Sequence, residues 1–259
     1  MRIRNLCLAL FLIAGVSLCW AQTITVAAAS DLQFAFQDAA ARFEKVSGKQ
    51  VKLIFGSSGN FFAQIQNGAP FDLFFSADLD YAKKLDAAGL AESGSLYEYA
   101  TGKIVLWAPR QSPVDLKRGL QVLLDPAIQK IAIANPEHAP YGRAAVAALR
   151  QEKLYDQVAG KFVMGENISQ TATFVVSGSA DVGIVALSLA LAPALKDKGK
   201  YAEIPANDYP PIEQAALILK SSQQKETARA FLAFVKSPEI VDLLKTYGFS
   251  VPVNAGASP

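Results

Sequence analysis

Short apolar runs alternate with amphipathic stretches along most of this 259-residue chain. Residues 23–27, 51–55 and 71–75 have the β-branched and aromatic content of buried strands. Between them, residues 31–46 place Leu32, Phe36, Ala39 and Phe43 on one stripe at helical spacing. Strands separated by helices require right-handed crossovers, so the pattern predicts an α/β fold with mainly parallel sheets.

A second unit of the same kind follows the first. Strand-like runs lie at 103–108, 130–134, 180–185 and 215–219, and helices are expected from Pro140 and after Asn167. Two helices are expected to close the chain, one that buries Ala228, Phe231, Leu232 and Val235 and one that begins at Ser237-Pro238. In the first unit, Gly48 is expected to end the helix over 31–46 and Ser76 to cap a helix from Asp78 towards Ala88. A chain of this length with about ten strands is expected to form two lobes. We assign residues 22–102 and 212–259 to the first lobe and 103–211 to the second, with linkers near 100–102 and 207–212. Ligands of open α/β sheets bind at the carboxyl ends of strands, here across a cleft between the lobes.

The first 21 residues are typical of a signal peptide. Arg2 and Arg4 precede an apolar run over residues 8–18, which is too short to span a bilayer, and Ala21 provides a small residue at the cleavage point. Cleavage predicts a periplasmic protein. An uncleaved anchor and a lipoprotein modified at Cys19 are the alternatives, the second disfavoured by the bulky Leu18.

Removing this segment leaves a neutral chain without thiols. Both cysteines, Cys7 and Cys19, lie within it. The 25 basic residues include Arg2 and Arg4, so 23 remain against 23 acidic residues. A balanced, scattered charge argues against nucleic acid or an anionic membrane as a partner.

Two polar turns indicate an anion site. Residues 27–31 (AAASD) and 55–59 (FGSSG) each follow a predicted strand and open a predicted helix. A serine at a helix start brings a hydroxyl and unpaired backbone N–H groups to one point, which suits an anion. Neither turn contains Lys or Arg. The donors are therefore neutral, as for a small oxyanion held by hydrogen bonds.

The chain resembles the periplasmic molybdate-binding proteins of ABC transporters, which have the type II solute-binding fold. Six stretches, in the family's order, carry the resemblance: 23–31 (TITVAAASD), 55–59 (FGSSG), 68–78 (GAPFDLFFSAD), 135–142 (NPEHAPYG), 181–185 (DVGIV) and 247–249 (YGF). They extend over nearly the whole chain after the signal segment.

The resemblance implies particular site residues. Ser30 and Ser58 match the family's two serines, with Ser57 beside the second, while Tyr141 and Ile168 match positions that donate backbone N–H groups. Asp31 is a further candidate through its N–H, and we expect its carboxylate to point away from the anion.

One position departs from the family. A branch of the family has a tyrosine after Gly-Ile-Val, where this chain has Ala186. The hydroxyl of Tyr141 is a candidate replacement.

Each of these residues also has a purely structural reading. Serines at helix starts commonly serve as caps, and Ile168 suits a core. A hydrolase triad of Ser58, His138 and an aspartate is the enzyme alternative, but the serine turn lacks the G-x-S-x-G pattern. A ligand-sensing domain of a transcriptional regulator is a third class.

The resemblance implies a function without catalysis. We expect a monomer that binds molybdate or tungstate, uses no cofactor or free metal cation, and delivers its ligand to the membrane permease of an ABC transporter. Sulfate or another tetrahedral oxyanion is the alternative ligand, because fold alone does not separate these ions.

Overall fold

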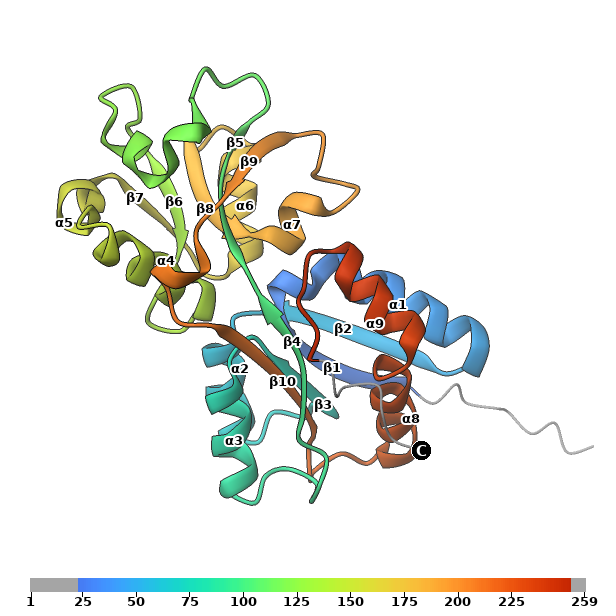
Figure 1. Ribbon diagram of the computed structural model, residues 1–259. Coiled ribbons are helices and arrows are strands. Elements are labelled where there is room, and N and C mark those ends of the chain that lie inside the picture. Colours follow the sequence, from blue (N-terminus) through green and yellow to red (C-terminus); the bar gives the residue numbers. More distant parts are fainter. Residues whose placement is uncertain (1–22, 253–259) are drawn as a thin grey trace, which may run out of the picture.

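The computed structural model describes residues 23–252, and the predicted signal peptide lies outside this range. Two five-stranded sheets, each flanked by helices, form two lobes joined by two extended crossings (Figure 1). This confirms the predicted two-lobed α/β fold.

The first lobe contains the sheet β2-β1-β3-β10-β4. Its strands are β1 (Thr23–Ala29), β2 (Gln50–Gly56), β3 (Leu73–Ser76), β4 (Tyr97–Gly102) and β10 (Ile212–Ile218). Its helices are the 3-10 turn η1 (Ser30–Leu32), α1 (Gln33–Ser47), α2 (Ser58–Gln66), α3 (Leu79–Ala87), α8 (Lys225–Val235) and α9 (Pro238–Thr246).

The second lobe contains the sheet β7-β6-β8-β5-β9. Its strands are β5 (Ile104–Pro109), β6 (Ile131–Ala134), β7 (Phe162–Gly165), β8 (Val182–Ala186) and β9 (Gly199–Glu203). Its helices are η2 (Leu116–Leu124), α4 (Pro140–Gln151), α5 (Tyr155–Val158), η3 (Ala159–Lys161), α6 (Ile168–Val176), α7 (Leu187–Leu191) and η4 (Ala206–Asp208).

Each sheet has one reversed strand, and that strand enters directly from the other lobe. In the first sheet β10 is antiparallel to β3 and β4, and in the second β5 is antiparallel to β8 and β9. The remaining pairs are parallel. The chain leaves the first sheet at Lys103, returns through residues 204–211, and pairs Ile212 with Gly102 on re-entry. The single-residue limits of the two lobes stay a prediction.

Apolar side chains on both faces of the first sheet explain its helix layers. On one face Phe36 of α1 packs edge-on against Phe75 of β3, with ring centroids 4.7 Å apart, and lies near Phe231 of α8. The predicted buried face of α8 is confirmed. On the other face α2 and α3 cover Phe74.

Local signals explain most helix ends. Gly48 ends α1 with a φ of 68°, and its N–H bonds the Glu44 carbonyl at 2.9 Å, as predicted. Ser237 caps α9 before Pro238, also as predicted. The expected capping of α3 by Ser76 is wrong. Asp78 caps it by accepting from the Asp80 N–H at 2.8 Å, because Ser76 is still in β3.

Two strands, β4 and β9, were not expected from the sequence. Both are edge strands, and polar or small residues separate their few aromatic ones, of which Tyr201 is 42% exposed. The helix expected over residues 31–46 also begins differently, since Ser30–Leu32 form a 3-10 turn before α1.

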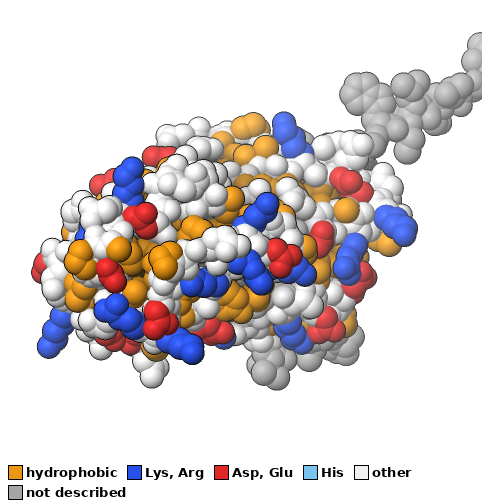
Figure 2. Space-filling view, turned by 90° about the horizontal axis from the view of Figure 1, so that it is seen from above, with side chains coloured by type: hydrophobic (Ala, Val, Ile, Leu, Met, Phe, Trp, Pro, Cys, Tyr) orange, Lys and Arg blue, Asp and Glu red, His pale blue; other side chains and the backbone are white. Residues whose placement is uncertain are grey.

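The surface shows no segregation of charge on the face seen in Figure 2, where acidic and basic side chains are interspersed. Within residues 23–252, no helix combines the length and apolar character needed to cross a membrane.

Candidate functional site

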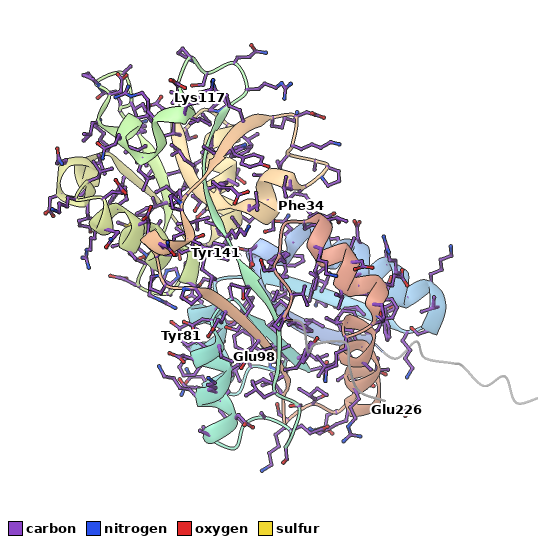
Figure 3. The ribbon with its side chains drawn as sticks, viewed as in Figure 1. Phe34, Tyr81, Glu98, Lys117, Tyr141 and Glu226 are labelled. Atoms are coloured by element: carbon purple, nitrogen blue, oxygen red, sulfur yellow. The ribbon has the colours of Figure 1, made fainter. Side chains whose placement is uncertain are left out.

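All six candidate site residues line one small cavity between the lobes. The first lobe contributes Ser30, Asp31, Ser57 and Ser58, and the second contributes Tyr141 and Ile168. Figure 3 shows Tyr141 at the junction of the two lobes. The sequence therefore identified residues that the fold brings together from both sheets, although their contact with a ligand stays a prediction.

The cavity lies where four helical segments begin. In the first lobe η1 follows β1 directly and α2 follows β2. In the second lobe α4 and α6 begin in the connections after β6 and β7. The first turn of a helix leaves backbone N–H groups without intrahelical partners and has a partial positive charge. The arrangement therefore suits an anion.

Ser58 is fully buried at the first position of α2. Its Oγ accepts a hydrogen bond from the Ala77 N–H at 2.9 Å. That bond uses a lone pair and leaves the hydroxyl proton free, and the described residues offer this proton no acceptor. Ser58 is therefore oriented to donate into the cavity.

Ser30, in the same lobe, also accepts a backbone hydrogen bond, but its donor lies across the cleft. Its Oγ accepts from the N–H of Ser169, in the first turn of α6, at 3.3 Å. The hydroxyl proton is again free of any described acceptor. This bond also joins the lobes, because Ser30 follows β1 and Ser169 belongs to the second lobe.

Ser57 lines the cavity and also has a structural role. It is the N-cap of α2, and its Oγ accepts from the Asn60 N–H at 3.4 Å. The same oxygen lies 2.9 Å from Nδ1 of His138. Nε2 of that histidine lies 3.4 Å from the Glu166 carboxylate. His138 therefore contacts Ser57 and not Ser58, so the weighed triad of Ser58, His138 and an aspartate is not assembled.

Ile168 begins α6, after the cap Asn167, whose side chain accepts from the Gln170 N–H at 3.0 Å. The side chain of Ile168 is buried. Among the described residues, no hydrogen bond engages the backbone N–H of Ile168 or of Tyr141 in the first turn of α4. Both amides are thus available at the cavity as donors.

Tyr141 uses its hydroxyl within the protein. The hydroxyl donates to Oδ2 of Asp31 at 2.8 Å, and Gln214 of β10 donates to the same oxygen at 2.7 Å. Burial, with the negative charge of Asp31, holds the pKa of Tyr141 well above its usual value. The hydroxyl therefore anchors the carboxylate, and the bond links the two lobes.

Asp31 lines the cavity and is buried. Its carboxylate oxygen Oδ1 has no hydrogen-bond partner among the described residues. Burial raises its pKa to about 6, although the bonds from Gln214 and Tyr141 oppose the rise.

Sequence reasoning missed three residues that hold Asp31. Gln214 and Ser188 are fully or almost fully buried, and Ser188 donates to the Asp31 carbonyl at 2.7 Å. Tyr99 donates to Oε1 of Gln214 at 2.7 Å. Gln214 directly precedes the strand-like run 215–219, and this was the available signal, because a buried amide requires hydrogen-bond partners. Ala186, where one branch of the family has a tyrosine, is buried at the end of β8.

At Gly59 the backbones of the two lobes touch so closely that no side chain fits between them. The Gly59 N–H donates to the His138 carbonyl at 2.9 Å, and a Cβ at position 59 would lie 2.6 Å from that oxygen. Together with the Ser30–Ser169 and Asp31–Tyr141 bonds, this contact defines a closed cleft.

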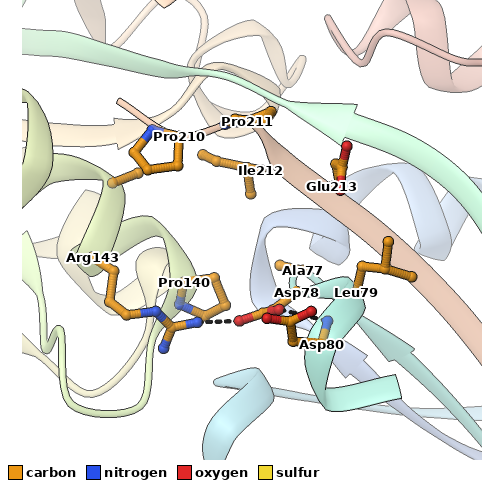
Figure 4. Close-up of a pocket in the computed structure, with 11 residues that line it drawn as sticks. Ala77, Asp78, Leu79, Asp80, Pro140, Arg143, Pro210, Pro211, Ile212 and Glu213 are labelled. Carbon is orange, nitrogen blue, oxygen red and sulfur yellow. Dashed lines mark hydrogen bonds and ion pairs between the residues drawn. The ribbon is translucent and has the colours of Figure 1, made fainter. Parts of the chain in front are cut away.

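A larger cavity of about 300 Å³ adjoins the small one and shares Ala77 and Pro140 with it (Figure 4). Arg143 of α4 pairs there with Asp78 at the start of α3 and lies over the Tyr81 ring. Its charge is thus already neutralised, and no Lys or Arg lines the small cavity. The sequence-predicted chemistry of neutral donors lies in the small cavity.

Comparisons with known proteins give a consistent family. Residues 24–250 match the family model described as bacterial extracellular solute-binding protein. The molybdate-binding protein ModA of Azotobacter vinelandii is 38% identical over 240 residues, covering 92% of this chain and 94% of that protein. ModA of Rhodobacter capsulatus is 36% identical, covering 93% and 94%.

Solved structures agree. The periplasmic molybdate-binding protein of Azotobacter vinelandii superposes with a TM-score of 0.83 at 38% identity, covering 88% of this chain and 99% of that chain. The sulfate-binding protein SubI of Mycobacterium tuberculosis reaches a TM-score of 0.73 at 17% identity, which shows a shared fold alone. The chain therefore belongs to the bacterial extracellular solute-binding proteins, with the ModA proteins as its relatives.

Proposed function

We propose that this protein binds molybdate in the small cavity between its lobes, binds tungstate comparably, and delivers the ion to the permease of an ABC transporter. The observation that carries the proposal is the convergence of Ser30, Ser58, Tyr141 and Ile168 on one cavity, in a chain whose relatives at 36–38% identity are named molybdate-binding proteins.

The donor set suits a fully deprotonated tetrahedral dianion. Two serine hydroxyls have free protons, and two backbone amides at helix starts are unengaged. Such an ion only accepts hydrogen bonds, so each donor gains a partner. A protonated phosphate carries its own O–H, which needs an acceptor, and none of these four donors can serve as one.

Binding closes the cleft in this proposal. The donors come from both lobes, so an ion held by all of them favours the closed arrangement over an open one. Small-angle scattering of the purified mature chain should show a smaller radius of gyration with saturating molybdate. An unchanged radius at demonstrated saturation would argue against closure.

Size is the proposed basis of selectivity. Molybdate, tungstate and sulfate share charge and hydrogen-bonding type, but sulfate is the smaller tetrahedron. Around it some donors would be too distant to bond, each loss weakening binding by roughly 1–3 kcal/mol. Two or three such losses amount to several orders of magnitude.

Calorimetric titration with molybdate, tungstate, sulfate and phosphate tests the assignment. We expect comparable tight binding of the first two ions and much weaker binding of the others. If sulfate bound as tightly as molybdate, the assignment of molybdate as the ligand would be wrong and sulfate would take its place.

The remaining parts of the proposal concern cellular context. The chain acts as a monomer in the periplasm, without a cofactor and without catalysis, after removal of residues 1–21. Membership of a solute-binding family supports a binding role. Mass spectrometry of the secreted protein identifies its first residue, and size-exclusion chromatography with light scattering gives its mass in solution.

A further inference from the structure

Asp31 is a carboxylate at an oxyanion site, which raises the question of how the two negative groups coexist. It lines the same cavity as Ser30 and Ser58 and is 2% exposed. Two negative charges close together and buried away from water would repel strongly. The answer lies in the hydrogen bonds around Asp31, and it rests on the oxyanion function proposed above.

The direction of each hydrogen bond in this network can be assigned. The Tyr99 hydroxyl lies 2.7 Å from Oε1 of Gln214 and 3.3 Å from the Ser76 carbonyl. Its single proton goes to the nearer acceptor, Oε1, which orients the amide. Nε2 of Gln214 then lies 2.7 Å from Oδ2 of Asp31 and 2.9 Å from the Tyr141 hydroxyl, and donates to both. Tyr141 gives its own proton to Oδ2 at 2.8 Å. Oδ2 therefore accepts two hydrogen bonds.

The other oxygen, Oδ1, is buried and has no partner among the described residues. Because Oδ2 is already an acceptor from two donors, a proton on the carboxyl group belongs on Oδ1. A carboxylic acid with its proton on Oδ1 becomes a donor, like the two serines beside it. The nearby backbone N–H groups of Asp31 and Leu32 favour the ionised form, but neither makes a full hydrogen bond to Oδ1. An ionised Oδ1 would therefore be a poorly satisfied buried acceptor, which is costly.

We propose that Asp31 holds the bound oxyanion as a neutral carboxylic acid that donates from Oδ1, and that each anion bound is accompanied by uptake of one proton from solvent. The proton moves from water to Oδ1, and no covalent bond to the anion forms. The site thereby gains a third side-chain donor and avoids a second negative charge.

The groups that face Asp31 favour this state. From β4 and α4 come the phenols of Tyr99 and Tyr141, whose pKa values burial holds well above the usual range, so both stay neutral. From β10 and α7 come Gln214 and Ser188, which do not titrate. No cation is among the described partners of Asp31. Its own pKa of about 6, raised by burial, rises further when a dianion arrives.

The sign of the pH effect follows. Above pH 6 the free protein has Asp31 ionised and the complex has it protonated, so binding consumes a proton and weakens as pH rises. Affinity for molybdate should fall by about tenfold for each pH unit above 6 while the complex keeps its proton. A site of permanently neutral donors would show no such slope.

The test is calorimetric titration with molybdate at pH 7.5 in Tris and in MOPS, whose ionisation enthalpies differ. Wild-type protein should take up close to one proton per anion. Asp31→Asn places an amide donor at the same position, so it should bind with proton uptake near zero and a flat pH profile. Asp38→Asn is the matched control, because Asp38 accepts from Tyr247 outside the cavity, and its uptake should equal wild type.

Tight wild-type binding without proton exchange would overturn this proposal and leave the binding function intact. Uptake that persists in Asp31→Asn would overturn it as well, and would point to His138, the nearby group at Ser57. If Asp31→Asn does not fold, wild-type uptake that persists in His138→Gln supports the proposal, and uptake lost in that variant overturns it. Absence of binding to molybdate, tungstate, sulfate and phosphate alike would instead overturn the proposed function.

Discussion

The two halves of the small cavity face the same space with different parts of the chain. The first lobe presents side chains, the hydroxyls of Ser30 and Ser58, each fixed by one backbone N–H. The second lobe presents its backbone, the N–H groups that begin α4 and α6. Side-chain donors depend on residue type, whereas backbone donors depend on where a helix begins. The two halves should therefore respond to different substitutions.

The largest effect is expected from removing both hydroxyls of the first lobe. A hydrogen bond to a charged ligand contributes about 1.5–3 kcal/mol, so Ser30→Ala or Ser58→Ala should weaken molybdate binding roughly ten- to a hundredfold. The double variant should lose roughly 10² to 10⁴ if the two effects add. Calorimetry measures the affinities, and circular dichroism checks the fold. Wild-type affinity in the double variant would reduce both serines to structural roles.

The backbone half can be tested without touching a functional side chain. Ile168 is the first residue of α6 and follows Asn167, whose backbone is extended, so the backbone there accepts proline. Proline removes the N–H and replaces the buried isoleucine side chain by its ring. Ile168→Pro should weaken binding about ten- to a hundredfold, as for one charged hydrogen bond.

The control for this variant is Ile168→Val, which keeps the N–H and most of the buried side chain. It should bind within about threefold of wild type, since a methylene is a small loss in a core. Equal affinity of the proline and valine variants would mean that the second lobe does not hold the ion through this amide.

The variant Gly59→Ala tests whether binding requires the two lobes to be in contact. In Gly59→Ala the new Cβ would lie 2.6 Å from the His138 carbonyl, so the closed cleft must widen. Such overpacking costs about 1–3 kcal/mol, which predicts roughly tenfold weaker binding or more. Gly160→Ala is the matched control, because its Cβ meets no atom within 4 Å. Faster dissociation in stopped-flow mixing should accompany the loss in Gly59→Ala, and an unchanged rate would contradict the role of lobe contact.

The smallest effect is expected at Tyr141, whose side chain reaches Asp31 of the first lobe. Tyr141→Phe removes the hydroxyl that donates to Asp31 but keeps the backbone N–H. Molybdate affinity at pH 7.5 should change by less than about tenfold, because one hydrogen bond between protein groups contributes only about 1 kcal/mol net. Abolished binding in a folded Tyr141→Phe protein would make the hydroxyl itself a main contact and erase the distinction between the halves.

The same distinction explains how far the sequence alone could lead. Alternating apolar runs predicted the two-lobed fold, and serine turns after strands predicted the first half of the site directly. Nothing in the residue types of Tyr141 or Ile168 indicates a donor, because every residue other than proline has an amide. Those positions came from the resemblance to a family and are placed at the cavity by the fold.

The residues that hold Asp31 could not be predicted in this way. Gln214 lies in β10, more than 180 positions after Asp31 in the chain, and meets it only because that strand re-enters the first sheet. Edge strands β4 and β9 were missed for a related reason. Their pairing partners, β10 and β5, decide their structure more than their own composition does.

The two crossings between the lobes leave the first sheet at the same rung, where Ile212 pairs with Gly102. Two chain crossings side by side at one level form a hinge, which bends more easily than it twists or stretches. A hinge at this one level favours opening and closing of the two lobes about a single axis. Under the proposed function, the angle between the lobes is what would differ between a filled carrier and an empty one.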